Sequence, residues 1–417
     1  MKFRLAIVLL FAVFAARLFA QTVPGHELSD FVAANELFGR KLLSSAHASA
    51  PDKNVVVSPL PVSFAFAPLI EATSDNETLT QITSAFEWRN TAINRPSGRI
   101  LSAAFKQPPP ARPRPHSKVS EPMWQLMNQE SPEELWLSSL FTYRGKHKLS
   151  EYFIDVGTKY FGLKFHSIPS NSAQSAPSFS NDSISAAIPK SSEPRDDDFW
   201  ITSTTHLRTA WADSTFSLGK QTSGNFFPET GGPESVPMLA SVLNMYDHEN
   251  NQDFESVVFV GLTAYIQVVL PSEGVRLSDL EDKIIRNPSY LSAAQNRELG
   301  YIEIPKFNFE FKTDVRETLE KMGVRKVFKT PLALAELVSG PEGAYLNGVS
   351  QETRIEFDEA GIRADAETAT TGVYGRIMGG QPKQFHMIVN RPFLFFIRDN
   401  VTNSLLFAGA VMDPAKH

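Results

Sequence analysis

Residues 390–399 read Asn390-Arg391-Pro392-Phe393-Leu394-Phe395-Phe396-Ile397-Arg398-Asp399, and a second apolar run, Leu405-Leu406-Phe407-Ala408-Gly409, follows six residues later. Both runs are rich in aromatic and aliphatic side chains, and the polar pair Asp399-Asn400 stands at the start of the link between them. Two such runs joined by a short polar turn predict a β-hairpin.

Upstream of this hairpin the signals are also mainly β. Two β-branched and aromatic runs, 254–260 and 265–270, predict a further hairpin, and Phe307, Phe309 and Phe311 alternate with polar residues as in a half-buried strand. The first part of the chain is more helical. Residues 29–43 carry apolar side chains at helical spacing, and Ser58-Pro59 supplies a cap and a first-turn proline for a helix to about residue 72. Helices first and strands later predict an α+β fold.

The N-terminus has the pattern of a secretory signal peptide over residues 1–20. Lys2 and Arg4 precede an apolar run from Leu5 to Ala16, which is shorter than the about 20 residues that span a bilayer. We therefore expect a secreted, extracellular protein, or a periplasmic one in a bacterium, without a membrane anchor. Removal of Lys2, Arg4 and Arg17 changes the formal charge from −6 to −9. A negative charge gives no reason to expect a nucleic-acid partner.

Composition and motif searches exclude several classes of chemistry. The chain has no Cys, which removes disulfides, thiolate metal sites and cysteine nucleophiles. The nine His show no metal-binding spacing, and no phosphate-binding glycine loop or Gly-x-Ser-x-Gly elbow occurs. Ser217-Leu218-Gly219-Lys220 matches the Ser-x-x-Lys of penicillin-recognising enzymes, but their other motifs are out of order or incomplete. We expect no enzyme activity, no metal and no cofactor.

Several motifs together resemble the serpin family. They are Val349-Ser350 through Glu359-Ala360-Gly361, the run 390–399, and the tail Leu406-Phe407-Ala408-Gly409-Ala410-Val411-Met412-Asp413-Pro414. Ser58-Pro59-Leu60 is similar to the family's N-terminal helix motif, Leu135–His166 to its strand and long helix, Ile201–Trp211 to a central strand ending in Trp, and Phe307–Gly323 to its strand-and-helix motif. The resemblance runs through residues 29–414 in one order.

This resemblance implies one domain over residues 21–417, although the length alone suggested two or three. A serpin has about nine helices, three β-sheets and an exposed reactive loop, here about 359–386. Such a protein would inhibit a serine protease as a suicide substrate. The protease cuts the loop and forms an acyl-enzyme, and the loop then inserts into the main five-stranded sheet.

The hinge of the loop has a pattern compatible with insertion. The resemblance assigns the hinge to Glu359, Gly361, Ile362, Ala364, Ala366 and Thr368. In an inserted strand the last four would face the core, and Arg363, Asp365 and Glu367 would face solvent. Ile362, Asp365 and Glu367 depart from the small residues usual in the family, but none places a charge on the buried side. The pattern therefore favours an inhibitor over a non-inhibitory serpin that acts as a carrier or binding protein.

The region that must open for insertion also departs from the family pattern. By resemblance it includes Ser58, Ser203, Trp211 and Gln351, with Pro61 where a second Ser is common. Serine and glutamine side chains can still exchange hydrogen bonds, whereas Pro61 removes one hydroxyl. We expect this difference to affect the rate of sheet opening rather than the fold.

The family spacing from Glu359 places the reactive bond between Gly375 and Arg376, and the long loop leaves Tyr374 and Ile377 as alternatives. Arg376 favours a trypsin-like protease as the partner of a monomeric inhibitor. A Pro-rich, basic insertion at about 94–118 is interpreted as a solvated loop, with polyanion binding over 95–118 the less favoured alternative. Asn76, Asn181 and Asn400 begin sequons that matter only in a eukaryotic secretory pathway.

Overall fold

The computed structural model describes residues 25–88, 134–144, 148–169, 177–180, 183–186, 199–211, 216, 222–291, 296–339, 343–363 and 384–416. The signal-peptide pattern at 1–20, the Pro-rich insertion at 94–118, Ser217–Lys220 and Asn181 lie outside these residues. Within them the chain forms six α-helices: α2 (Gly25–Ser49), α3 (Pro59–Phe66), α4 (Asn76–Ala85), α7 (Glu151–Phe161), α8 (Leu277–Arg286) and α9 (Val315–Lys321). Short 3₁₀ turns complete the helical part: η1 (Ala67–Ile70), η3 (Pro288–Leu291), η4 (Lys326–Phe328) and η5 (Pro331–Leu334).

The strands form three sheets in this part of the chain. The largest has ten strands: β1 (Val55–Val57), β7 (Thr222–Phe226), β8 (Glu234–Ala240), β9 (Asn244–Asn250), β10 (Phe254–Val260), β11 (Ala264–Pro271), β12 (Asn296–Pro305), β16 (Gln384–Ile388), β17 (Phe393–Asp399) and β18 (Leu405–Val411). The main mixed sheet has the order β13-β14-β15-β6-β2-β3: β13 (Phe307–Asp314), β14 (Gly348–Asp358), β15 (Gly361–Arg363), β6 (Phe199–Ala210), β2 (Glu134–Arg144) and β3 (Lys164–Ile168). β4 (Pro177–Ser180) and β5 (Ser183–Ala186) form a separate pair.

The C-terminal hairpin is confirmed and lies at the centre of the core. β17 pairs antiparallel with β18, and every residue of both strands is buried. β18 also pairs with β1, so the end of the chain is joined to the strand that precedes α3. The C-terminal hairpin therefore joins the last strand of the described chain, β18, to its first strand, β1.

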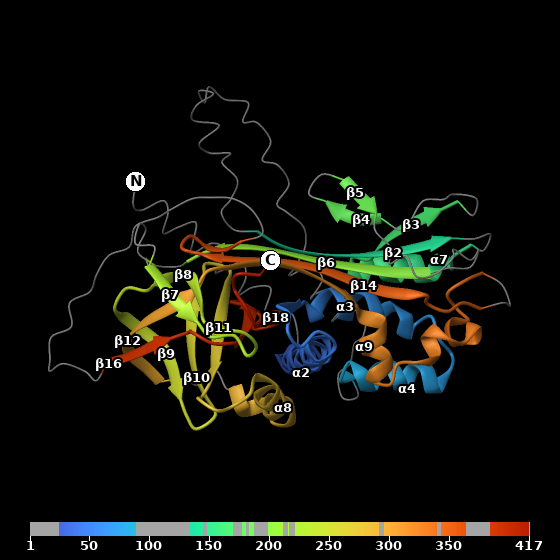
Figure 1. Ribbon diagram of the computed structural model, residues 1–417. Coiled ribbons are helices and arrows are strands. Elements are labelled where there is room, and N and C mark those ends of the chain that lie inside the picture. Colours follow the sequence, from blue (N-terminus) through green and yellow to red (C-terminus); the bar gives the residue numbers. More distant parts are fainter. Residues whose placement is uncertain are drawn as a thin grey trace, which may run out of the picture.

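The helices pack mainly beneath one face of the main sheet (Figure 1). α3 contacts β2 and β6, and α9 contacts β14. Asp314 caps α9 by accepting from the Arg316 N–H at 2.9 Å, and the helix ends just before Gly323. Helix α7, in contrast, has only eleven residues, shorter than the long helix that the resemblance placed in 135–166.

Candidate functional site

The start of the candidate reactive loop is part of the main sheet. β14 ends at Asp358, the chain turns at Glu359-Ala360, and β15 then pairs antiparallel with β14 on one side and β6 on the other. The Asp358 carboxylate accepts hydrogen bonds from the N–H groups of Ala360 (2.8 Å) and Gly361 (3.2 Å), which fixes the turn. The expected five strands are thus β13, β14, β6, β2 and β3. The short strand β15 lies between β14 and β6 and is called the wedge below.

Gly361 allows this wedge to form. Its φ is 153°, and a Cβ at this position would lie 2.1 Å from the carbonyl oxygen of Thr209. Only glycine combines this backbone angle with so close an approach to β6. The next residue, Ile362, is opposite Phe357 on β14 and Thr209 on β6, and its side chain is 2% exposed. The side chain of Ile362 is therefore buried between β14 and β6 in the intact protein.

Trp211 and an ion pair close the outer end of this wedge. The Trp211 indole donates to the carbonyl oxygen of Asp358 at 3.0 Å, and its ring packs against Phe216, Phe259 and Phe357. Lys306, on the link between β12 and β13, forms a salt bridge of 2.6 Å with Glu359. Sequence reasoning found Trp211 and Glu359 but missed Lys306, because nothing in the pattern of 305–307 indicates its partner.

β14 and β6 pair directly with each other only at the end of the sheet away from the wedge. They pair directly, in parallel, from Gly348 opposite Trp200 to Glu352 opposite Thr204. Between these five pairs and β15, residues 353–355 of β14 have no direct partner on β6. The hydroxyl of Thr353 in this interval is buried and has no hydrogen-bond partner among the described residues. β14 and β6 are therefore paired with each other at one end of the sheet, called the closed end, and separated by β15 at the hinge end.

Ser58 and Gln351 hold the closed end to the helices beneath. Gln351 accepts from the Ser58 N–H at 2.8 Å and donates to the Ser58 carbonyl at 2.6 Å, so it satisfies both backbone groups at the start of α3. The Ser58 hydroxyl lies 2.6 Å from the Thr205 hydroxyl on β6 and donates to the Leu406 carbonyl at 2.6 Å. One serine thus connects β14, β6 and β18.

The resemblance grouped Ser203 with Ser58 and Gln351, but its hydroxyl faces Ser139 of β2. Its hydroxyl lies 3.4 Å from that of Ser139 on β2, and Ser139 donates to the carbonyl of Pro61 at 2.8 Å. Ser139 thus connects β2 to the backbone of α3 at Pro61. Thr205 and Ser139 are the residues of this cluster that sequence reasoning missed, although Thr205 has the same strand parity as Ser203.

The loop beyond Arg363 lies outside the described residues. This applies to the proposed hinge positions Ala364, Ala366 and Thr368, and to the proposed reactive-bond residues Tyr374, Gly375, Arg376 and Ile377. The chain is described again from β16, which pairs in parallel with β12.

His248 anchors β16. Its ring stacks on that of Phe385 with 3.7 Å between centroids, and its two nitrogens lie 2.9 Å from a carboxylate oxygen of Glu298 and 3.0 Å from one of Glu255. Burial lowers the pKa of His248, but the hydrogen bonds to Glu255 and Glu298 outweigh this, so the pKa lies above its ordinary value. With both nitrogens facing carboxylates, the protonated imidazolium is the form that satisfies the site.

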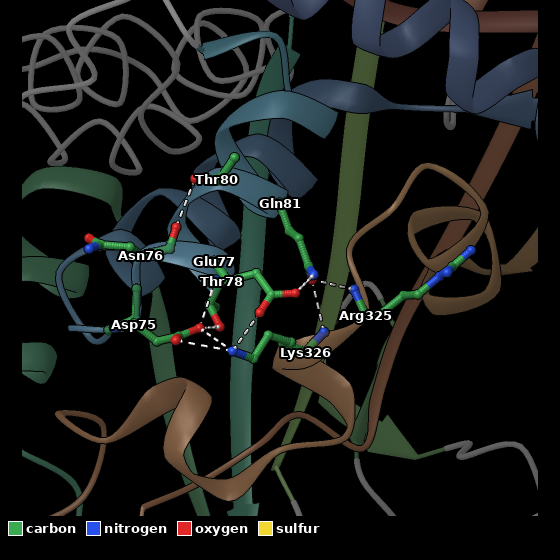
Figure 2. Close-up of polar contacts among 9 residues, drawn as sticks. Asp75, Asn76, Glu77, Thr78, Thr80, Gln81, Arg325 and Lys326 are labelled. Atoms are coloured by element: carbon green, nitrogen blue, oxygen red, sulfur yellow. Dashed lines mark hydrogen bonds and ion pairs between the residues drawn. The ribbon is translucent and has the colours of Figure 1, made fainter.

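Two of the three sequons lie in described turns. Asn76 is exposed at the first turn of α4, where Figure 2 shows Asp75 accepting from the N–H and hydroxyl of Thr78 (2.8 and 2.6 Å). Hydrogen bonds from Thr78, and then from Lys326 of η4, lower the pKa of Asp75 to about 2. Asn400 is exposed but donates to the carbonyl of Gly261 at 2.8 Å. Glycan attachment at either residue stays a prediction.

In the described part of the chain, no group of three or more His, Asp or Glu side chains is placed to hold a metal ion. None of the helices described has the length and apolar character needed to cross a bilayer.

The main mixed sheet, with the short strand β15 between β14 and β6, is the feature that defines the class of this protein. The family model for the serpin (serine protease inhibitor) family matches residues 33–414, and the chain belongs to this family. Serpins are in general protease inhibitors rather than catalysts. Serpin-Z7 of Hordeum vulgare is 31% identical over 151 residues, 36% of this chain and 37% of that protein. The chain spans about half the length of the curated relatives it matches, between 37% and 60% for five of them.

Solved structures share the fold. AtSerpin1 of Arabidopsis, in its native stressed conformation, has a TM-score of 0.75 at 18% identity, over 93% of this chain and 99% of that one. Thyroxine-binding globulin in complex with thyroxine has a TM-score of 0.72 at 18% identity, over 92% and 99%. At these identities the likeness shows the fold alone, which inhibitory and non-inhibitory serpins share.

Proposed function

We propose that this serpin is a secreted suicide-substrate inhibitor of serine endopeptidases. The observation that carries the proposal is the register of the wedge. Phe357 and Thr209, which flank Ile362, are 148 positions apart, and Gly348 and Trp200, which pair directly at the closed end, are also 148 apart (357 less 209, and 348 less 200). A loop strand that continued β15 would therefore pass between β14 and β6 without any slip of either strand.

The core face along this path suits the loop. In the extended register Ala364 would lie between Ile355 and Leu207, which are 3% and 2% exposed. Ala366 would lie between Thr353 and Thr205, which are 1% and 4% exposed. Directly opposed residues of neighbouring strands share a face of the sheet, so both alanines would be buried without a charge or a large side chain.

The next position on this face, Thr368, would lie between Gln351 and Ser203, both of which are buried. A threonine hydroxyl can exchange hydrogen bonds with these two polar side chains. A strand that alternates correctly over four buried positions supports insertion, because a charge at any of them would cost several kcal/mol.

One residue of the solvent face supports the same path. Asp365 would lie beside Arg354, which is exposed on β14, and opposite charges on directly opposed residues favour pairing. Glu367 would lie directly opposite Glu352, and like charges in that arrangement disfavour pairing. The Lys312 ammonium group, 3.4 Å from the Glu352 carboxylate, offsets part of this repulsion.

We further propose that the reactive bond is Gly375–Arg376, with Tyr374 and Ile377 as alternatives, and that the target is trypsin-like. An arginine at the bond would be read by an acidic specificity pocket. Export by the segment 1–20 and a monomeric state are parts of the same proposal. N-terminal sequencing of the mature protein tests the export, and its elution in size-exclusion chromatography tests the monomeric state.

Incubation with trypsin tests the central claim. We expect a complex that survives boiling in detergent, and a released C-terminal peptide whose intact mass locates the bond. The melting midpoint of the protein cleaved in its loop should rise steeply, because the loop adds a strand to the sheet. Cleavage by trypsin-, chymotrypsin- and elastase-like proteases with neither a complex nor a rise in midpoint would overturn the proposal.

That failure would favour the second candidate, a non-inhibitory serpin that acts as a carrier or binding protein. Its support is that thyroxine-binding globulin, solved with thyroxine, has the same fold.

A further inference from the structure

Strand β16, the first described element after the candidate reactive loop, has few backbone connections to the rest of the protein. Among the described strands it pairs with β12 alone, over the five residues Gln384–Ile388. Because cross-strand side-chain contacts supply much of the stability of a sheet, a strand paired on one side depends strongly on them. The side chains that β16 turns towards the core therefore decide how firmly it is attached.

Phe385 is the side chain that connects β16 to a strand other than β12. It lies opposite Gly300 of β12, where a Cβ would be only 2.0 Å from the Phe385 ring, so this glycine leaves the space that the ring occupies. The ring stacks on that of His248 of β9, with 3.7 Å between centroids and 4° between planes. Tyr246 of β9 meets the same ring edge-on at 6.3 Å. Phe385 thus reaches across β12 and is held by β9.

Two carboxylates from two further strands fix the His248 ring. Nδ1 lies 2.9 Å from an oxygen of Glu298 on β12, and Nε2 lies 3.0 Å from an oxygen of Glu255 on β10. The His248 side chain is only 4% exposed, whereas those of Glu255 and Glu298 are 20% and 45% exposed. The ring is therefore shielded from water while both of its carboxylate partners reach the surface.

The remaining charges on these strands do not contact the ring. Side chains alternate between the two faces of a strand, which places five ionisable residues of β9, β12 and β16 on the face opposite to His248 and Phe385. They are Asp247, Glu249, Arg297, Glu303 and His386. Arg391, which precedes β17, interacts with the charge of Glu255 but directs Nε and Nη2 to the Pro271 carbonyl at 2.9 and 2.6 Å. Glu255 and Glu298 are therefore the charges that control the protonation of His248.

Only the protonated ring matches both carboxylates. An imidazolium donates from both nitrogens, whereas a neutral imidazole donates from one and turns a lone pair towards the other carboxylate. Water can relieve this mismatch at the buried nitrogen only if Phe385 leaves the ring. The positive charge is also attracted to the face of the stacked Phe385 ring. Both effects make the attached state of β16 more favourable when His248 carries its second proton.

We propose that His248 is a pH-sensitive lock on β16: the imidazolium retains Phe385, and the neutral imidazole lets Phe385 and β16 separate from the sheet. The attached strand fixes the C-terminal end of the candidate reactive loop, and its separation would lengthen the free chain between β15 and β17. The contacts that carry the proposal lie in the ten-stranded sheet, so it holds whether or not the protein inhibits proteases.

A single engineered cysteine tests the lock in the full chain. The protein has no Cys, so Met387→Cys and Ile388→Cys each carry one thiol, the first at a buried position of β16 and the second at a position that is 40% exposed. Each variant is treated with iodoacetamide from pH 6 to pH 9, and alkylation is followed by mass spectrometry. The rate at residue 388 divided by the rate at residue 387, the protection ratio, corrects for ionisation of the thiol.

We expect the protection ratio to fall about tenfold across this range, which corresponds to a difference of about one unit between the pKa of His248 in the attached and the separated state. A protection ratio that is the same at pH 6 and pH 9 would overturn the proposal. In His248→Gln, which cannot titrate, the ratio should be low at pH 6 and independent of pH. A fall that persists unchanged in this variant contradicts the role of His248.

Two glutamine substitutions on β12 then identify the charges that set the transition. Glu298→Gln removes one carboxylate from His248, so the fall in the protection ratio should move to lower pH by about one unit. The control is Glu303→Gln, which makes the same change on the opposite face, where Glu303 lies 3.2 Å from the exposed His386. Equal movement of the transition in these two variants would contradict the assignment.

If Met387→Cys does not fold, hydrogen exchange in the unaltered chain replaces the thiol. The exchange rate of the amides of 384–388 is divided by that of the same peptide in the unfolded chain, which corrects for the dependence of exchange on hydroxide. This corrected rate should rise about tenfold from pH 6 to pH 9, and a constant value would overturn the proposal. Neither measurement involves a protease, so failure of the lock and failure of the proposed inhibition are distinguishable.

Discussion

Ile362 lies directly opposite Thr209 of β6 while its chain neighbour Gly361 is opposite Ala210, so the first two residues of the hinge strand are already paired with the far side of the gap. The Ile362 side chain is 2% exposed and also meets Phe357 of β14. In the intact protein, β15 therefore already lies in the space between β14 and β6 at the hinge end of the sheet.

Replacing Ala366 with arginine should convert the inhibitor into a substrate. The proposed insertion would bury residue 366 between Thr353 and Thr205, whereas Ile362 is already buried in the intact protein. A charged side chain at 366 therefore costs several kcal/mol on insertion, and about 1.4 kcal/mol already shifts a partition tenfold. We expect the yield of detergent-stable trypsin complex to fall by at least about tenfold while cleavage continues. Ala366→Ser, which keeps a small side chain, is the control and should inhibit like the wild type. Equal complex yields for the arginine variant and the wild type would contradict the role of the hinge.

Replacing Gly361 with alanine should force the hinge out of the sheet. The added Cβ would meet the Thr209 carbonyl at 2.1 Å, and the φ of 153° is unfavourable for alanine, so the native state should lose more than about 1 kcal/mol. Trp211, which donates to the Asp358 carbonyl beside this turn, should emit at longer wavelength. The difference spectrum against the same variant carrying Trp211→Phe isolates this signal. Gly232→Ala, where a Cβ meets nothing within 4 Å, should show neither effect.

Replacing Gln351 with leucine should destabilise the closed end of the sheet. Both backbone groups of Ser58 lose their buried partner, at about 1–3 kcal/mol each. Urea unfolding should show this loss as a lower midpoint. Ser203→Ala removes only the 3.4 Å contact with Ser139 and should cost less than about 1 kcal/mol. If the two variants unfold alike, Gln351 does not connect β14 to α3 energetically.

Reversing the charge of Arg354 should reduce the stability gained on loop cleavage. If Asp365 comes to lie beside residue 354, Arg354→Glu replaces an attractive pair with a repulsive one, at about 0.2–1 kcal/mol. The rise in melting midpoint between intact and cleaved protein should shrink by up to about 1 °C. Arg286→Glu, the same reversal at an exposed residue of α8, should leave the rise unchanged.

Stability should decline on the alkaline side of neutrality. The folded pKa of His248 lies above its ordinary value, so its contribution is complete below the unfolded pKa of about 6.5 and is lost as the pH rises through the folded pKa. The pKa of His47, paired with Glu281 at 2.9 Å, is also raised and acts in the same direction. Melting midpoints from pH 5.5 to 9 should therefore fall less in His248→Gln than in the wild type. A slope identical to that of the wild type would exclude His248 as a source of the dependence.

Local patterns in the sequence were sufficient for the hairpins and for the cap of α9, whereas the Ser58 side chain, expected to cap α3, instead hydrogen-bonds to Thr205 and Leu406. Contacts between distant segments could not be predicted in this way. The ion pair of Lys306 with Glu359, for example, joins residues 53 positions apart and leaves no local periodicity. The resemblance supplied Ser58 and Gln351, whereas Thr205 and Ser139 emerge only when β6 and β2 are placed above α3. The cluster of Arg398, Arg40 and Glu36 also required the fold, since α2 and β17 lie at opposite ends of the sequence.

The direction of β15 has a thermodynamic consequence. β14 and β6 pair in parallel where they meet directly, whereas β15 is antiparallel to both. A strand that extended β15 would replace one slanted, parallel ladder with two antiparallel ladders, which have straighter hydrogen bonds and are slightly more stable per residue. The first residues that entered, opposite 353–355, would break no direct pair of β14 with β6, and each later residue would break one interstrand connection and form two.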